Sequence, residues 1–191
     1  MRPVLYLHGF NSSPLSFKAQ ALQAAWRQAG LPPQYLHVPA LPNDPREAVA
    51  LAGDWLGRHT DAVLVGSSLG GCYATYLAEK YARKALLINP AVRPWLRFHQ
   101  YLGPQQNYST GVRWELTEAH VAALARLETP PPQDPERFVV WLQTGDETLD
   151  YREAVDFYHG CRLDIQQGGD HAYQGFEGRI PELLAFAGHN A

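Results

Sequence analysis

Short apolar runs recur along the chain, and most are separated by stretches with the periodicity of amphipathic helices. Six of these runs have the length of a strand and are bounded by Gly, Pro or Asn. They span residues 4–7, 35–38, 62–65, 85–88, 138–142 and 162–165. The first, third, fourth and fifth runs show little polar alternation, which is typical of parallel strands covered on both faces. The pattern therefore predicts about six mostly parallel strands.

Helical patterns fill most of the intervals between these runs. Apolar stripes occupy residues 22–29, 48–56, 69–77 and 180–187. The second stripe follows Asp44 as a helix cap, with Pro45 at the first helical position and Glu47 placed to complete a capping box. Strands that alternate with helices indicate right-handed βαβ units. We therefore predict an α/β fold, a three-layer α/β/α sandwich that forms a single domain over residues 1–191.

The alternation of strands and helices breaks between residues 88 and 138. This interval contains several aromatic residues, one helical pattern near residues 117–127 and the proline-rich sequence TPPPQDPE. A connection of this length usually forms a lid or a binding loop, and we predict a lid-like insertion at about residues 91–136. Its aromatic residues between Trp95 and Trp114 would either shape a substrate pocket or simply pack the insertion against the rest of the fold.

The sequence VLVGSSLGGC, at residues 63–72, joins an apolar run directly to a helical stripe. It contains G-x-S-x-G with Ser68 at the centre, a pattern in which the flanking glycines allow a sharp strand–turn–helix bend. Ser67 does not fit, because Val65 and Leu69 occupy the positions where this pattern requires glycine. Glycine-rich loops can also bind phosphate, but GxGxxG and GxxxxGKS/T are both absent from the sequence. The motif favours Ser68 as a nucleophile at a helix N-terminus over a turn that only packs this helix.

A nucleophilic serine needs a histidine base, and the base needs an orienting acid. For a G-x-S-x-G serine, both follow in the chain at the ends of later strands, in the order Ser, Asp or Glu, His. His171 in GGDHAY follows the run 162–165, and the two glycines before it let the loop turn the ring inward. The alternative interpretation of His171 is a surface-loop histidine. His189 is expected to lie in a frayed terminus.

Three carboxylates in QTGDETLD compete for the role of the acid, after the run 138–142. Asp146 is nearest to the strand end, where a rigid element would hold it. Glu147 follows it directly, and Asp150 is expected to cap the next helix. A capping role is also the alternative for Asp146 itself. We predict Asp146 as the acid.

Acyl transfer also needs backbone N–H groups that stabilise the oxyanion. One donor is expected from Leu69, the residue after the nucleophile, and the other from Phe10 in the loop LHGFNSS. Gly9 permits a close approach in this loop. His8 either orients the loop or is a hydrogen-bonded structural histidine.

Four blocks of sequence carry a resemblance to a known family: YLHGFNSSPLSFKAQ, GSSLGG, QTGDETLDYREAV and GGDHAYQGFE. With these blocks the chain resembles the α/β-hydrolase superfamily and, more closely, the small bacterial esterases of the YqiA type. The blocks extend over nearly the whole chain. The resemblance implies a serine esterase that hydrolyses acyl esters through an acyl-enzyme, with Ser68, Asp146 and His171 as the triad and no cofactor.

Two features depart from the superfamily pattern. The acid loop commonly reads G-x-x-D, and this count from Gly145 ends at Thr148 rather than at an acid. Alignment of DETLDY with the common D-x-x-V-P-Y instead places the acid at Asp146. The chain also starts with the strand that usually comes third, so two antiparallel edge strands are expected to be missing.

Composition and charge limit the expected partners. A formal net charge of −3 argues against a nucleic-acid partner, because such proteins usually carry a basic patch. No apolar run reaches the ~20 residues that span a bilayer. The N-terminal sequence MRPVLYLHGF lacks the apolar core of a signal peptide, and with two cysteines in the chain this favours the cytoplasm. No HExxH or similar cluster occurs among the eight histidines, so no metal site is expected.

The expected substrate is a small acyl ester or thioester. An acyl-thioesterase or an acyltransferase would use the same triad, and a non-catalytic binding protein could retain the same fold. The sequence leaves the acyl chain length and the oligomeric state open.

Overall fold

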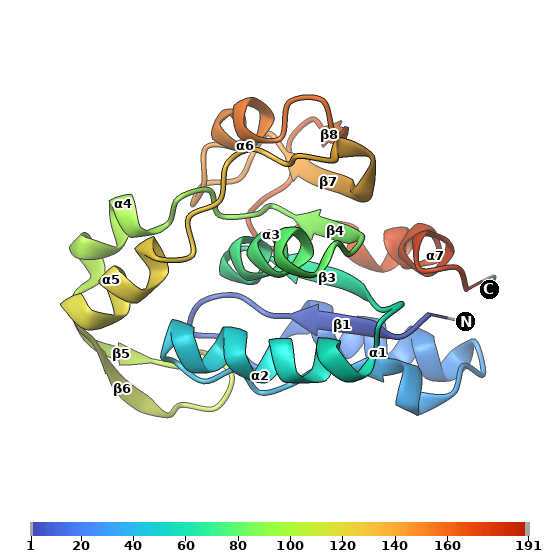
Figure 1. Ribbon diagram of the computed structural model, residues 1–191, viewed down its shortest axis with the longest axis horizontal. Helices are drawn as coiled ribbons and strands as arrows, with labels where there is room; N and C mark the ends of the chain where they lie inside the picture. The colour runs from blue at the N-terminus through green and yellow to red at the C-terminus, as the bar shows by residue number, and fades with distance from the viewer. Residues whose placement is uncertain (1, 190–191) are drawn as a thin grey trace.

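The computed structural model describes residues 2–189 and centres on a parallel sheet of six strands in the order β2-β1-β3-β4-β7-β8 (Figure 1). The six apolar runs of the sequence form its strands. These are β1 Val4–Leu7, β2 Leu36–His37, β3 Val63–Ser67, β4 Ala85–Ile88, β7 Phe138–Gln143 and β8 Arg162–Gln166. Every neighbouring pair is parallel. The prediction of about six mostly parallel strands is therefore confirmed, although the run at 35–38 gives a strand of only two residues.

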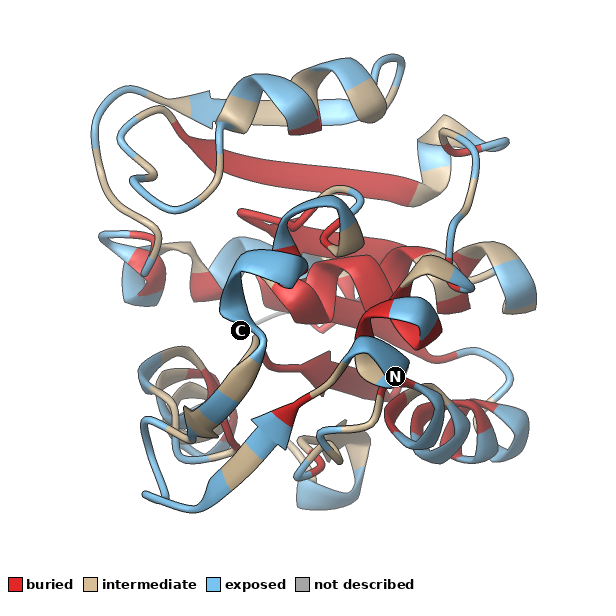
Figure 2. Ribbon diagram, turned by 90° about the vertical axis from the view of Figure 1, so that its left-hand side faces the viewer, coloured by how far each residue is buried: buried red, intermediate tan, exposed pale blue. Residues whose placement is uncertain are grey.

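Helices cover both faces of the sheet and complete the predicted three-layer sandwich. One face carries α1 (Phe17–Gln28) and α7 (Phe176–Phe186). The other face carries α2 (Pro45–Arg58), α3 (Leu69–Tyr81) and α6 (Tyr151–Phe157). Figure 2 shows the central strands almost uniformly buried, whereas the outer surfaces of the helices are exposed.

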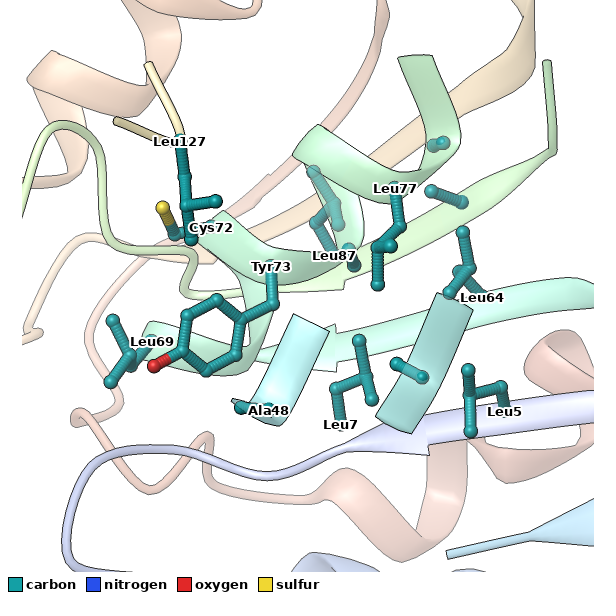
Figure 3. Packing of buried hydrophobic residues seen from close by; sticks show 14 of the residues in the cluster. Leu5, Leu7, Ala48, Leu64, Leu69, Cys72, Tyr73, Leu77, Leu87 and Leu127 are labelled. Carbon is teal, nitrogen blue, oxygen red and sulfur yellow. The ribbon is translucent and has the colours of Figure 1, made fainter. Parts of the chain in front are cut away.

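Alternate side chains of each strand enter the two cores. In β1, Leu5 and Leu7 pack with α2 and α3, whereas Val4 and Tyr6 pack with α1 and α7. Figure 3 shows part of the first of these cores, in which Leu77 of α3 lies near Leu64 and Leu87 of the strands. Because both faces are apolar, the strands read as continuous hydrophobic runs rather than as alternating ones. This arrangement explains why the sequence pattern located the sheet.

The start of α2 differs in one detail from the expectation. Asp44 caps the helix as predicted, but its side chain accepts the N–H of Arg46. The Arg46 guanidinium also donates to both carboxylate oxygens of Asp44. Within residues 2–189, Glu47 makes no return hydrogen bond to the Asp44 N–H, so the expected capping box is not formed.

The C-terminal end of the described chain corrects a second expectation. His189 is not frayed, because only 2% of it is exposed and its Nε2–H donates to the carbonyl of Arg2 at 2.7 Å. Its ring also packs edge-on against Trp26 of α1. The apolar stripe of α7 continues to Ala187, which is fully buried, and His189 follows it onto α1.

The segment between β4 and β7 forms a separate layer at one end of the sheet. It contains α4 (Trp95–Phe98), β5 (Gly103–Gln106), β6 (Arg113–Leu116) and α5 (Glu118–Ala125). Figure 1 shows these elements gathered at the end of the sheet opposite the two termini. The helix expected near residues 117–127 is confirmed as α5, whereas the function of the segment as a lid stays a prediction.

The antiparallel hairpin of β5 and β6 was not predicted. Its strands read GPQQ and RWEL and pair with Gly103 opposite Leu116. β5 starts with Gly-Pro and has no β-branched or aromatic residue, so it lacks the usual strand signals. Its position follows from contacts with the rest of the fold, which local sequence does not express.

Within residues 2–189, no helix combines the length and the apolar character that crossing a bilayer requires.

Candidate active site

Ser68 occupies the turn between β3 and α3 in a backbone conformation that serine rarely adopts. Its φ is 55° and its ψ is −122°. The turn is held on both sides, because the Ser68 N–H donates to Ile88 O and the Ser68 carbonyl accepts the N–H of Ala91. A non-glycine residue with positive φ of this kind costs on the order of 1–3 kcal/mol and marks a position fixed by its surroundings.

The two glycines of the motif are required by close backbone contacts. A Cβ on Gly66 would lie 2.3 Å from the carbonyl oxygen of Gly70. A Cβ on Gly70 would lie 2.0 Å from the carbonyl oxygen of Leu7 in β1. Glycine at these two positions therefore allows the first turn of α3 to lie directly against β1. Ser68 then sits in the turn at the end of β3.

Ser68, His171 and Asp146 form one continuous chain of hydrogen bonds. His171 Nε2 lies 3.0 Å from Ser68 Oγ, and His171 Nδ1 lies 2.8 Å from Asp146 Oδ2 and 3.0 Å from Oδ1. A carboxylate can only accept, so Nδ1 carries the proton and Nε2 is left to accept the serine hydroxyl. The three side chains follow β3, β8 and β7, and their strand ends meet at the same edge of the sheet.

The three candidate acids have three different partners. Asp146 binds the His171 ring, and its Oδ1 also accepts the N–H groups of Thr148 and Leu149. Its side chain is 2% exposed. Glu147 instead accepts the backbone N–H of His171 at 3.0 Å. Asp150 caps α6 through the N–H of Arg152, as expected. This geometry favours Asp146 as the partner of the imidazole.

The hydrogen bonds to Glu147 change its acidity. Its own backbone N–H and that of His171 hold the pKa of the Glu147 carboxyl below its usual range. Glu147 is therefore ionised throughout the neutral range and fixes the backbone of His171 rather than its ring.

Two buried side-chain amides, which the sequence motifs do not reveal, support the His171 loop. Gln143, at the end of β7, accepts the N–H groups of Asp170 and Gln174 with its Oε1. Asn89, directly after β4, donates from Nδ2 to Asp170 O at 3.0 Å and accepts the Gln143 N–H. Both side chains belong to residues that are 3% exposed. Polar residues at the ends of apolar runs are the sequence signal that could have found them.

Lys18 of α1 was missed as well. Its Nζ donates to the carbonyl oxygen of Ala172, the residue after His171, at 2.9 Å. Burial lowers the pKa of Lys18 to about 8, although the carboxylates of Asp170 and Asp146 partly oppose the shift. At neutral pH Lys18 is therefore mostly charged, and its ammonium group interacts electrostatically with the carboxylates of Asp170 and Asp146.

The loop after β1 lies against Ser68. A Cβ on Gly9 would lie 3.1 Å from the Cβ of Ser68, so a larger residue would press on the serine. Within residues 2–189, the backbone N–H groups of Phe10 and Leu69 have no hydrogen-bond acceptor. Both residues line the same cavity as Ser68.

His8 ties this loop to a neighbouring segment. Its Nε2 accepts the N–H of Leu41, and its Nδ1–H donates to the carbonyl of Gly9. Burial lowers the pKa of His8, which keeps the ring neutral. His8 is therefore a hydrogen-bonded structural histidine, and the same two hydrogen bonds hold the loop in place.

A cavity of about 280 Å³ opens in front of Ser68 and His171. Its walls are mainly apolar and aromatic, and include Phe10, Leu69, Val92, Phe98, Tyr108 and Leu149. Phe98 and Tyr108 belong to the segment between β4 and β7, so this segment forms part of the wall. Within residues 2–189, no group of three His, Cys, Asp or Glu side chains is placed to hold a metal ion.

Comparison with known structures agrees with this architecture. The chain is similar to α/β hydrolase domain-containing protein 10 from mouse, with 14% identity, a TM-score of 0.68, and coverage of 96% of this chain and 89% of the other. It is also similar to Est1E from Butyrivibrio proteoclasticus with ferulic acid bound (14% identity, TM-score 0.64, coverage 97% and 88%). A structure of LipS and LipT, metagenome-derived lipolytic enzymes, gives 18% identity, a TM-score of 0.63 and coverage of 97% and 92%. At these identities the likeness shows the fold, and the predicted α/β-hydrolase fold is confirmed.

A family model gives a match along nearly the entire sequence. The model of the uncharacterised protein family UPF0227 matches residues 3–188. This range contains all four blocks that carried the resemblance to the α/β-hydrolase superfamily. The chain therefore belongs to the UPF0227 family, and it has the fold of the α/β hydrolases.

Proposed function

We propose that this protein is a serine esterase, with Ser68 as the nucleophile, His171 as the base and Asp146 as the acid. The observation that carries the proposal is the continuous chain of contacts of 2.8–3.0 Å from Asp146 through His171 to Ser68. A serine hydroxyl becomes a competent nucleophile only when a base can take its proton, and a base of this kind needs an orienting acid.

The reaction would follow two steps. Ser68 Oγ bonds to the acyl carbon while His171 Nε2 takes the hydroxyl proton, and the alcohol then leaves with that proton. Water, deprotonated by His171, next attacks the acyl carbon; the bond from this carbon to Ser68 Oγ breaks, Oγ takes the proton back from His171, and the carboxylic acid leaves. Asp146 would hold the imidazole in the required tautomer and stabilise its charged form.

The backbone N–H groups of Phe10 and Leu69 are the proposed oxyanion donors. Both N–H groups lack an acceptor among the described residues, and both residues line the cavity in front of Ser68. Donors of this kind act because they are already oriented where negative charge develops.

An acyl ester fits the surroundings of Ser68. The cavity is lined mostly by apolar and aromatic side chains, which suits the acyl part of such a substrate. Fold neighbours that include Est1E and lipolytic enzymes also support hydrolysis of esters.

We further propose that residues 1–191 act as one domain and that residues 91–136 supply a wall of this pocket.

The test is covalent labelling of the folded protein with a fluorophosphonate probe, followed by peptide mass mapping. We expect one adduct, on Ser68, and turnover of p-nitrophenyl esters that Ser68→Ala abolishes. Ser67→Ala, one residue earlier, is the matched control and should keep both the adduct on Ser68 and the turnover of p-nitrophenyl esters. A folded protein without an adduct on Ser68 would contradict the proposal. An adduct without turnover of any ester would favour a binding protein, and faster turnover of matched thioesters would favour a thioesterase.

A further inference from the structure

Asn11 connects the loop after β1 to the hairpin of β5 and β6. Its Nδ2 donates to Gln105 Oε1 at 2.9 Å, and its Oδ1 accepts from Trp114 Nε1 at 2.7 Å. Its backbone carbonyl accepts the N–H of Tyr108 at 2.8 Å. The side-chain amide and the carbonyl of this one residue are therefore all bound to the hairpin, although its side-chain partners lie 94 and 103 positions away in the chain.

The conformation of Asn11 suits this role. Its φ is 52°, in the left-handed region that asparagine enters more readily than most residues, and it is only 5% exposed. Asparagine also offers a donor and an acceptor on a short side chain, which matches the two side-chain partners. The next residue adds a further bond, because Ser12 O accepts from Asn107 Nδ2 at 2.7 Å.

Phe10, directly before Asn11, bears the second of the proposed oxyanion donors. Its ring packs edge-on against Phe98 and Trp114, with centroid distances of 4.9 and 5.7 Å. The segment between β4 and β7 therefore contacts Phe10 through its ring, and it holds the following residue by hydrogen bonds. The Phe10 N–H is attached to the Cα that carries this ring, one residue before Asn11, so both contacts restrict its position.

We propose that Asn11 is a positioning residue, which holds the Phe10 N–H at the site by joining its loop to the β5–β6 hairpin. This proposal rests on the serine esterase function proposed above. It makes the hairpin a fixed part of the site rather than a lid that opens, because movement of the hairpin would break the four bonds and displace the oxyanion donor.

The test compares wild type, Asn11→Gly, Trp114→Phe and the double variant in hydrolysis of p-nitrophenyl butyrate. Asn11→Gly keeps the positive φ and removes only the side chain. Trp114→Phe keeps an aromatic ring beside Phe10 and removes the Nε1 donor together with one ring of the indole. Gln106→Ala is the matched control, because Gln106 is an exposed residue of β5 whose side chain bonds to Gly111 within the hairpin.

Active sites are titrated with the fluorophosphonate, so that kcat refers to competent sites only. For Asn11→Gly we expect kcat to fall about 10- to 100-fold, with KM changed less than about threefold, because a displaced donor weakens the transition state and not substrate binding. Trp114→Phe should lower kcat less. The double variant should lose no more than Asn11→Gly alone, since both changes act through one contact.

Three results would overturn the proposal: a kcat of Asn11→Gly within twofold of wild type, a loss confined to KM, or a smaller titratable fraction with a normal kcat per site. The last result would show a structural role alone. If wild type is active and Asn11→Gly is equally active, only the positioning role fails. If wild type neither hydrolyses esters nor forms an adduct on Ser68, the proposed function fails and the positioning role fails with it.

Discussion

Asp146 accepts the Nδ1–H of His171 at 2.8 Å, while the two residues are 25 positions apart in the chain. The neighbouring carboxylate, Glu147, binds only the backbone N–H of the same histidine. Two adjacent acids thus hold one histidine at two different points. The contact of the ring with Asp146 and the contact of the backbone with Glu147 can therefore be removed separately by mutation.

Asp146→Asn should lower kcat for ester hydrolysis by about 1,000- to 10,000-fold, because an amide no longer enforces the tautomer in which Nε2 accepts the serine proton. Glu147→Gln keeps an acceptor for the backbone N–H and should stay within about tenfold of wild type. Steady-state kinetics with active-site titration measures both. Equal losses in the two variants would contradict the assignment of Asp146 as the acid.

Lys18 gives a prediction about pH. Burial lowers its pKa to about 8 in the folded protein, below its value in the unfolded chain. Between about pH 8 and pH 10 the unfolded chain therefore binds more protons, so the contribution of Lys18 to the free energy of unfolding rises with pH in this window. Below pH 8 both states are protonated and the contribution is constant.

The comparison with Lys18→Met isolates this effect, because every other titrating group is shared. We expect the stability of the variant relative to wild type to decrease as the pH rises from 7.5 to 9.5, as measured by urea unfolding. Lys84→Met, which removes one exposed positive charge, is the control. A stability difference between Lys18→Met and wild type that does not change with pH would contradict the lowered pKa.

Gly70 and Gly57 should respond in opposite directions to alanine. A Cβ on Gly70 would meet the carbonyl oxygen of Leu7 at 2.0 Å, and this oxygen belongs to β1, which cannot move away cheaply. Gly70→Ala should therefore destabilise the fold by about 1–3 kcal/mol or more. Gly57 lies in α2 with nothing within 4 Å of an added Cβ, so Gly57→Ala should stabilise it by up to about 1 kcal/mol. Urea unfolding of both variants tests the pair, and equal shifts would be inconsistent with the close contact.

The two cysteines differ in accessibility. Burial raises the pKa of Cys72 to about 12 and that of the half-buried Cys161 to about 11. With Ellman's reagent at pH 8, the folded protein should therefore show no reaction of Cys72 and a slow reaction of Cys161, because the thiolate is the reactive form. In denaturant both thiols of each chain should react. In the folded protein, Cys161→Ser should remove the slow reaction. Two fast thiols in the folded protein would refute the prediction.

The sheet could be predicted from the sequence because strands that are buried on both faces consist of consecutive apolar residues. β1, β4 and β7 are the clearest cases. The hairpin was missed because GPQQ has no such pattern, and because its hydrogen bond with Asn11 joins residues 94 positions apart in the chain. Local periodicity expresses burial, but it does not express a pairing of this kind.

The candidate site was predicted in part for a similar reason. The order of the chain placed Asp146, Glu147 and Asp150 after the same strand, and only the direction of each side chain separates their partners. Gln143 and Asn89 were missed because a polar residue at a strand end does not reveal a partner many positions later. Such contacts are decided by tertiary packing.

Ser68 and His171 are 103 positions apart, and they follow strands that are separated in the sheet by β4 and β7. Their contact can form only when all of these parallel pairs are in register, including the last pair, β7 with β8. Parallel pairing over long sequence distances is slow to form. A growing chain on the ribosome would thus remain unable to activate its serine until the C-terminal quarter has emerged and docked, so that any activity of this protein appears last in its folding.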